Sequence, residues 1–341
     1  MRAFTYHQAS QVEVAVTAAA LLDDHDDIPP TAAGAQFLAG GTTLLDLMKL
    51  DVMRPQELVD INAVAGLDKI SATPEMLKLG ALVRMAEVAG HPAILNQLPV
   101  IAQSLAFAAS PQLRNMASLG GNVLQRTRCP YFRDTSWSAC NKRQPGSGCA
   151  ALESFNRMHA VLGTSEHCIA TYPGDFAQAL IALDAVVAVT GRRGSRKLPF
   201  AELHREPGTT PDVETALAPG ELITAFEVPA ASWQRRSRYL KIRDRQSYEF
   251  ALASAAVALD IDSDGVVQQA RIALGGVATR PWRATEAEKA LAGRRLDDVA
   301  AARAAEIAFA EARGRKDNTF KIELGKRTLV RALLETAAME I

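Results

Sequence analysis

The sequence lacks an excess of charge of either sign, because 38 Lys and Arg residues balance 38 Asp and Glu residues in a chain of 341. A net charge of zero argues against nucleic-acid binding through a strong basic field. Long apolar runs are also missing: the longest, residues 250–259, has about half of the ~20 residues that span a bilayer. The remaining composition, 48% hydrophobic and 22% charged, is typical of a globular protein of about two or three domains.

Several catalytic motifs are absent from the chain. It contains no G-x-x-x-x-G-K-[ST] phosphate loop, no H-E-x-x-H zinc motif and no G-x-S-x-G nucleophile elbow. The six histidines are scattered, and no acid–base pair stands out, so we assign no catalytic residue. The apolar N-terminal stretch begins with Ser10 and Glu13 in a capping-box pattern. We therefore expect a surface helix ending near Asp23, and no export signal.

Cysteine is scarce and confined to one region. The four cysteines, Cys129, Cys140, Cys149 and Cys168, have 10, 8 and 18 residues between them. Two disulfides, a structural zinc site and an iron–sulfur cluster are all compatible with four such residues. The spacing contains no close pair of the kind usual in zinc sites, and it leaves the three alternatives open. His159 and His167 lie nearby and are weaker candidate ligands.

The surrounding cysteine segment, residues 125–168, has the composition of a loop. Pro, Gly, Asn and Ser are frequent between residues 127 and 149, where we expect little regular secondary structure. This segment contains five basic residues: Arg126, Arg128, Arg133, Lys142 and Arg143. They either form a solvated surface or partly offset the negative charge of a four-thiolate cluster.

Two glycine turns punctuate the first half of the chain. A predicted buried strand at residues 36–39 runs into the first glycine turn, Gly40-Gly41-Thr42-Thr43, and a helical pattern follows. The second glycine turn, Ser118-Leu119-Gly120-Gly121-Asn122, directly precedes the cysteine segment. Strand, glycine turn and helix together can present backbone N–H groups to phosphate, although a tight turn that needs positive φ is an equally good interpretation of two glycines.

The elements predicted along the chain divide it into three blocks. We expect a small lobe at residues 1–62, a second lobe at 63–232 that contains the cysteine segment, and a C-terminal α+β domain at 233–341, where strands are followed by helices. The Ala- and Arg-rich run at residues 300–312 is interpreted as a solvated helix.

Several motifs together resemble the FAD-binding medium subunit of the xanthine dehydrogenase/molybdenum hydroxylase family. The motifs are Phe37-Leu38-Ala39-Gly40-Gly41-Thr42-Thr43-Leu44, Leu79-Gly80-Ala81, Ser118-Leu119-Gly120-Gly121-Asn122, Pro173-Gly174-Asp175, Leu183-Asp184-Ala185 and Glu221-Leu222-Ile223. The resemblance covers essentially the whole chain. It implies an α+β fold, in which a two-lobed FAD-binding domain of the vanillyl-alcohol-oxidase/PCMH type precedes a C-terminal domain of the CO-dehydrogenase flavoprotein type.

The cysteine segment is similar to that of one branch of the family, the bacterial periplasmic aldehyde oxidoreductases, whose medium subunit carries an additional [4Fe–4S] cluster. The resemblance therefore implies that Cys129, Cys140, Cys149 and Cys168 bind such a cluster. It also implies FAD contacts from the following residues: Gln36, Phe37, Leu38, Ala39, Gly40, Gly41, Thr42, Thr43, Leu44, Ser118, Leu119, Gly120, Gly121, Asn122, Asp175, Ile223 and Lys241. Taken alone, Lys241 could equally be a solvated strand residue.

The function implied by the resemblance is electron transfer. A large molybdopterin subunit would oxidise an aldehyde, a small subunit with two [2Fe–2S] clusters would pass the electrons on, and FAD in this chain would deliver them to an external acceptor. One alternative is the β subunit of a 4-hydroxybenzoyl-CoA reductase-like enzyme. Another is a non-catalytic FAD-carrying or disulfide-stapled assembly scaffold. Export to the periplasm with a signal-bearing small subunit is expected, and the cytoplasm is the alternative.

Overall fold

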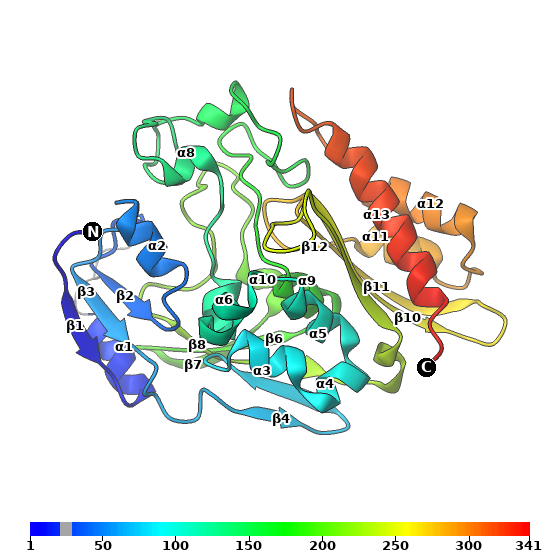
Figure 1. Cartoon of the computed structure of the whole chain (residues 1–341), viewed down its shortest axis with the longest axis horizontal. Coiled ribbons are helices and arrows are strands. Elements are labelled where there is room, and N and C mark those ends of the chain that lie inside the picture. The colour runs from blue at the N-terminus through cyan, green and yellow to red at the C-terminus, as the bar shows by residue number, and fades with distance from the viewer. Residues whose placement is uncertain (21–28) are drawn as a thin grey trace.

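The computed structural model describes residues 1–20 and 29–341. Three sheets run through the chain in order: a three-stranded sheet, a five-stranded sheet and a four-stranded sheet. Figure 1 shows the first at the N-terminal end of the molecule and the last beneath the C-terminal helices. No helix in the described part of the chain combines the length and apolar character needed to cross a membrane.

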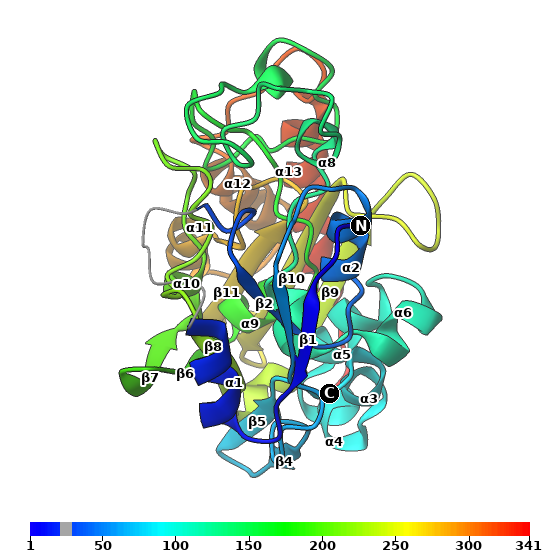
Figure 2. The ribbon, with the colours of Figure 1, turned by 90° about the vertical axis from the view of Figure 1, so that its left-hand side faces the viewer.

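The N-terminal lobe is a parallel sheet in the order β1-β3-β2 with two helices. Figure 2 views this lobe from the front. The predicted succession of strand, glycine turn and helix is present as β2 and α2. The expected end of the first helix near Asp23 lies outside the described residues. The elements are β1 (Thr5–Gln8), α1 (Val12–Ala20), β2 (Ala35–Leu38), α2 (Leu44–Lys49) and β3 (Glu57–Asp60).

The second lobe is built on an antiparallel sheet in the order β4-β5-β8-β6-β7. Short helices pack on it around an apolar core that includes Phe176 and Phe226. The elements are β4 (Ile70–Ala72), β5 (Met76–Gly80), α3 (Met85–Gly90), α4 (Pro92–Gln97), α5 (Pro99–Ala106), α6 (Pro111–Met116), α7 (Leu119–Val123), α9 (Phe176–Ala182), β6 (Val186–Gly191), β7 (Gly194–Pro199), α10 (Phe200–Leu203) and β8 (Leu222–Pro229).

The cysteine segment forms most of a separate lobe at the top of Figure 1. Its only helices are α8 (Pro130–Arg133) and the 3-10 turn η1 (Ala150–Leu152), and an isolated bridge pairs Cys140 with Cys149. The expected loop character is largely observed. The helix α8 is the exception, and it forms because Pro at the first helical position fixes φ near the helical value.

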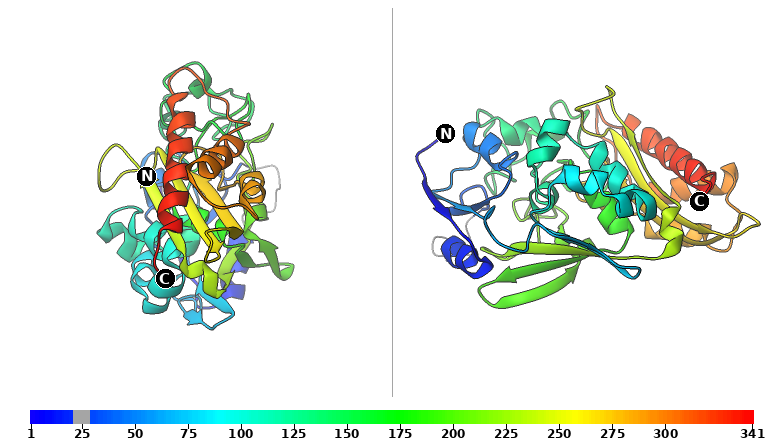
Figure 3. Two further views of the ribbon diagram at one scale, coloured as in Figure 1. Left: turned by 90° about the vertical axis from the view of Figure 1, so that its right-hand side faces the viewer. Right: turned by 60° about the horizontal axis from the view of Figure 1, so that its bottom comes forward.

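The C-terminal domain is an antiparallel sheet in the order β12-β11-β10-β9, with three helices on one face (Figure 3). The expectation of a solvated Ala/Arg helix was wrong for one side of α12, where Ala301, Ala304 and Ala305 are buried in the core of this domain, with α11 and α13 as neighbours. The elements are η2 (Ser232–Arg235), β9 (Ser237–Ile242), β10 (Ala253–Ile261), β11 (Val267–Gly275), β12 (Trp282–Arg283), α11 (Thr285–Leu291), α12 (Asp298–Ala308) and α13 (Phe320–Ala337).

Candidate functional site

A cavity of about 740 Å³ lies between the two lobes, with walls from both glycine turns, the cysteine segment and the loop 205–221. The residues implied as FAD contacts that line it are Gln36, Phe37, Ala39, Gly40, Gly41, Thr42, Thr43, Leu44, Ser118, Gly120, Gly121 and Ile223. Five others do not line it: Leu38, Leu119, Asn122, Asp175 and Lys241. Because the turn after β2 packs against the residues that precede α7, residues far apart in the sequence meet at this space.

The first glycine turn exposes unpaired backbone donors to the cavity. Gly41 has φ of 71°, a conformation that side chains rarely tolerate. Within residues 1–20 and 29–341, the N–H groups of Gly41, Thr42 and Thr43 have no acceptor. A Cβ atom on Gly40 would overlap the carbonyl oxygen of Met116, so this glycine also allows two backbones to approach. Free N–H groups beside a glycine turn suit an anionic diphosphate.

The second glycine turn pairs its backbone N–H groups with acceptors inside the protein. The four N–H groups of residues 119–122 donate to Val83 O, Ala81 O, Ser118 Oγ and Ser118 O at 2.8–3.2 Å. A Cβ on Gly120 would stand 3.2 Å from Ala81 Cβ, which is a tight contact. The glycines of this turn therefore serve packing and helix capping, and their N–H groups are not available to a ligand.

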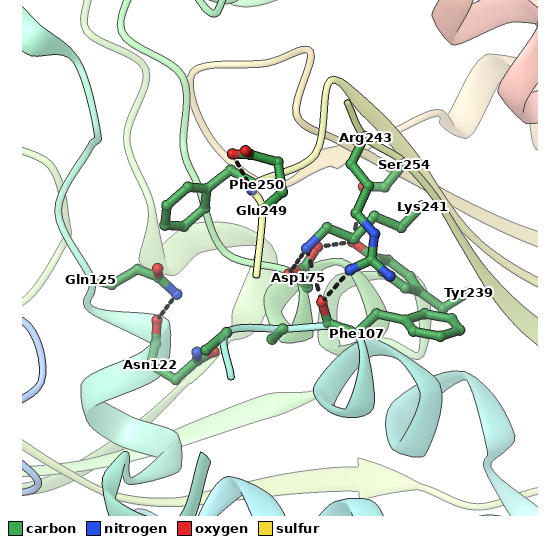
Figure 4. Close-up of polar contacts among 12 residues, drawn as sticks. Phe107, Asn122, Gln125, Asp175, Tyr239, Lys241, Arg243, Glu249, Phe250 and Ser254 are labelled. Atoms are coloured by element: carbon green, nitrogen blue, oxygen red, sulfur yellow. Dashed lines mark hydrogen bonds and ion pairs between the residues drawn. The ribbon is translucent and has the colours of Figure 1, made fainter. Parts of the chain in front are cut away.

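Asn122 supplies the second turn with an acceptor. Its Oδ1 is buried and has no hydrogen-bond partner among the described residues, while Nδ2 lies 3.4 Å from Met85 Sδ. Its carbonyl accepts a hydrogen bond of 2.8 Å from Gln125 Nε2 (Figure 4). Because an unpaired buried acceptor costs free energy, this amide is better satisfied by a ligand that donates to it.

Asp175 and Lys241 form a buried ion pair. Lys241 Nζ lies 2.8 Å from Asp175 Oδ2 and 3.0 Å from Phe107 O, and the two side chains are 2% and 4% exposed (Figure 4). The Tyr239 hydroxyl donates to Asp175 Oδ1 at 2.7 Å and also lies 2.9 Å from Ser254 Oγ. The Lys241 ammonium is therefore held by protein groups, and it fixes β9 against α5 and the start of α9. Lys241 is no solvated strand residue.

The four cysteines lie together beneath the wall of the large cavity. Cys129, Cys140 and Cys168 are buried, Cys149 is partly exposed, and all four line one small apolar void. Each is a free thiol, so neither disulfide considered from the sequence is present in this structure. They pack in an apolar group with α2 and α8, which brings Leu47 of the first lobe against them.

The thiols differ in acidity because their surroundings differ. Burial raises the pKa of Cys129 to about 12. The hydrogen bond from Cys149 lowers the pKa of Cys168, and the Lys142 ammonium acts in the same direction against the effect of burial. Among residues 1–20 and 29–341, no group of three or more His, Cys, Asp or Glu side chains is arranged to hold a single metal ion. Cysteine thiolates are the donors that hold iron–sulfur clusters, and the four thiols that line this void are of that type.

The start of α13 and Asn318 just before it hold the part of the cysteine segment between Cys149 and Cys168. Asn318 Nδ2 donates to the carbonyl of Ala160 at 3.0 Å, and the buried Lys321 Nζ donates to the carbonyl of His159 at 3.0 Å. His159 Nε2 in turn lies 3.2 Å from Cys129 Sγ. Burial, with a contribution from Arg157, lowers the pKa of Lys321 to about 7. The C-terminal domain thus fixes the backbone next to one thiol. His167, the other candidate from the sequence, is exposed.

Sequence reasoning missed the 205–221 loop and its ionic anchor. The loop contributes a large share of the cavity wall, and its Glu214 forms ion pairs with Arg126 and with Lys142 of the cysteine segment. The available signal was the turn-rich stretch of residues 207–211, which indicates a loop but not its contacts.

Comparisons with known proteins agree with this architecture. Residues 2–231 match the FAD binding domain in molybdopterin dehydrogenase, and residues 238–337 match the CO dehydrogenase flavoprotein C-terminal domain. The chain is 46% identical over 340 residues to the aldehyde oxidoreductase FAD-binding subunit PaoB of Escherichia coli, covering 99% of each chain. It is 27% identical to the carbon monoxide dehydrogenase medium chain of Afipia carboxidovorans, covering 91% of this chain and 86% of that one.

A solved structure shares the fold as well. The carbon monoxide dehydrogenase of Hydrogenophaga pseudoflava superposes with a TM-score of 0.74 at 26% identity, covering 98% of this chain and 97% of that one. The expected fold class is confirmed by the two domain matches and this superposition. The cavity with its glycine turn is thus part of an FAD-binding domain, and the chain is an oxidoreductase subunit that belongs to the FAD-binding medium subunits of the xanthine dehydrogenase/molybdenum hydroxylase family.

Proposed function

We propose that this chain is the electron-transfer subunit of a molybdenum-dependent aldehyde oxidoreductase and carries both FAD and a [4Fe–4S] cluster. The observation that carries the proposal is the position of the four thiols, which meet in one buried pocket directly behind the wall of the FAD cavity. The 46% identity to an aldehyde oxidoreductase subunit over nearly the whole chain favours this enzyme over a 4-hydroxybenzoyl-CoA reductase-like one.

The residues of the first lobe fit the diphosphate of FAD. The free N–H groups of Gly41, Thr42 and Thr43 would hold it. Asn122 does not line this cavity, so its unpaired amide oxygen would accept a hydrogen bond from a part of the cofactor that extends beyond it. When bound, FAD supplies the ability to exchange electrons singly or in pairs. The chain itself binds the cofactor, in a cavity walled by both lobes and the cysteine segment.

The cysteine pocket fits a cluster in donor type and in charge. Cluster binding would replace the hydrogen bond between the thiols of Cys149 and Cys168 with sulfur–iron bonds. Lys142 is buried next to these thiols, and Arg143 donates hydrogen bonds to carbonyls of α8. Their positive charge offsets the negative charge of thiolates in an apolar setting.

Iron analysis of single variants tests the cluster. We expect about four iron atoms per chain in the parent protein and a large loss of iron in each of the variants Cys129→Ser, Cys140→Ser, Cys149→Ser and Cys168→Ser. FAD should remain partly bound. Ser138→Ala, an exposed change in the same segment, is the matched control and should keep its iron. Stoichiometric zinc in the parent, or full iron in any cysteine variant, would contradict the assignment.

The partners and the compartment follow from the same proposal. We propose a heterotrimer with a small subunit that carries [2Fe–2S] clusters and a large molybdopterin subunit, exported to the periplasm by a signal on the small subunit. Co-purification with subunit, molybdenum and flavin analysis tests the assembly. Cell fractionation with and without that signal tests the export; the same cytoplasmic location in both strains would rule it out.

A further inference from the structure

A single layer of residues separates the FAD cavity from the cysteine pocket. Lys142, Cys168 and Ala170 line both spaces. Lys142 lies in the chain between two of the cysteines, and its side chain is only 10% exposed. A change in the cysteine pocket therefore reaches the cavity wall without passing through any other element.

Lys142 is tied to the far wall of the cavity as well as to the cysteine segment. Its Nζ lies 2.8 Å from Glu214 Oε1 and donates a hydrogen bond of 2.8 Å to the carbonyl of Pro211. Glu214 also pairs with Arg126, at the beginning of the cysteine segment. Three charged side chains that are mostly removed from water thus join the cysteine segment to the 205–221 loop.

These ion pairs hold the middle of the 205–221 loop, while Glu206 pairs with Arg280 and Glu221 pairs with Arg196 nearer its ends. In the described structure it contains no helix or strand, and it runs between α10 and β8 along the cavity. Its internal hydrogen bonds are few, such as that from Arg205 N to Glu214 O at 2.9 Å. Because a mostly buried carboxylate is stable only with its partners in place, Glu214 ties the middle of the loop to Lys142 and Arg126.

We propose that Lys142 is a positioning residue that couples the two sites, so that an ordered, iron-loaded cysteine segment holds the 205–221 loop in the conformation that binds FAD. The inference rests on the proposed cluster and FAD sites. Thermodynamic linkage then requires the reverse effect of equal size: bound FAD must protect the iron of the cysteine pocket. No electron movement is involved, since the coupling acts through the shape of the cavity wall.

The first test needs no substitution. The purified complex is stripped of flavin, and FAD affinity is measured by fluorescence before and after iron is removed with an oxidant and a chelator. We expect the iron-free protein to bind FAD about tenfold more weakly, and FAD to slow the loss of iron to the chelator. A parent that contains no iron would overturn the proposed cluster and this inference together. A parent that holds both groups, but whose FAD affinity is independent of iron, would overturn only the coupling.

The second test assigns the coupling to Lys142. In Lys142→Met we expect FAD to bind about tenfold more weakly even with iron present, and iron removal to weaken it no further. Lys142→Arg should restore most of the iron-dependent difference, because it keeps the charge. Lys197→Met is the matched control, since Lys197 pairs with Glu227 on the exposed strand β7. A Lys142→Met protein with the same iron dependence as the parent would overturn the role of this residue.

Discussion

The first glycine turn leaves its N–H groups without acceptors, whereas the second turn consumes its own within the protein. The first lies between a parallel strand and a short helix, with Gly41 in a left-handed conformation. The second caps α7 through Ser118 and packs its glycine against Ala81. Two similar glycine pairs therefore have different roles. The first turn offers N–H donors to a ligand, and the second turn packs against the neighbouring backbone at Ala81.

The largest effect is expected at the first turn. Gly41→Val places a β-branched side chain at φ of 71° and brings its Cβ within 2.9 Å of Leu45 Cδ1. The turn must change shape, and the loss of charge-assisted hydrogen bonds from its free N–H groups to the diphosphate would weaken FAD binding by about a hundredfold. The free energy of unfolding should also fall by about 1–2 kcal/mol. Fluorescence titration with FAD and chemical denaturation measure the two effects.

Gly66→Val is the control for strain alone. Gly66 has φ of 84°, nothing within 4 Å of a built Cβ, and no place in the cavity wall. The free energy of unfolding should fall by a similar amount, with FAD affinity unchanged. Full FAD occupancy in Gly41→Val would remove Gly41 from the binding site.

At the second turn the effect should shift from binding to stability. In Gly120→Ala the new Cβ meets Ala81 at 3.2 Å, and we expect a loss of about 1–3 kcal/mol in the free energy of unfolding. FAD affinity of the folded protein should change less than about threefold, because the N–H groups of this turn are already paired. A large loss of FAD affinity with an unchanged free energy of unfolding would contradict the proposed difference between the two turns.

Asn122 should be the exception within the second turn. Asn122→Ala removes a buried oxygen that has no partner among the described residues, so the flavin-free protein should be no less stable. FAD affinity should fall about 5- to 30-fold if the amide oxygen accepts a hydrogen bond from the cofactor. Denaturation of the flavin-free protein and FAD titration give the two numbers. Equal affinity in parent and variant would assign Asn122 to packing alone.

The smallest expected effect is a pH dependence of the free energy of unfolding, caused by His204 next to the second turn. His204 Nε2 lies 3.1 Å from Val123 O, at the end of α7, and burial lowers the pKa of His204 to about 4. The unfolded chain takes up this proton near the ordinary pKa of 6.5, so the contribution of His204 to stability is constant above that value and falls as the pH drops towards 4. Between pH 7 and pH 5 the loss should be about 1–2 kcal/mol. His204→Gln should remove this slope, and His7→Gln, at an exposed position, should keep it.

Local sequence pattern was informative about both proposed cofactor sites. The strand, glycine turn and helix of the first lobe follow from consecutive residues, and the clustering of four cysteines is evident from their positions in the chain. The difference between the two turns could not be predicted, because two of the four acceptors of the second turn, the carbonyls of Ala81 and Val83, lie far away in the chain between β5 and α3. The ion pairs of Lys241 with Asp175 and of Lys142 with Glu214 were hidden for the same reason: their partners lie far away in the chain.

The contacts of α13 with the cysteine segment have a consequence for biosynthesis. Asn318 and Lys321 hold the backbone at His159 and Ala160, yet they are translated long after the last cysteine. A nascent chain that has emerged through Cys168 still lacks the helix that closes this region. The backbone beside the thiol pocket therefore gains these contacts only near the end of synthesis.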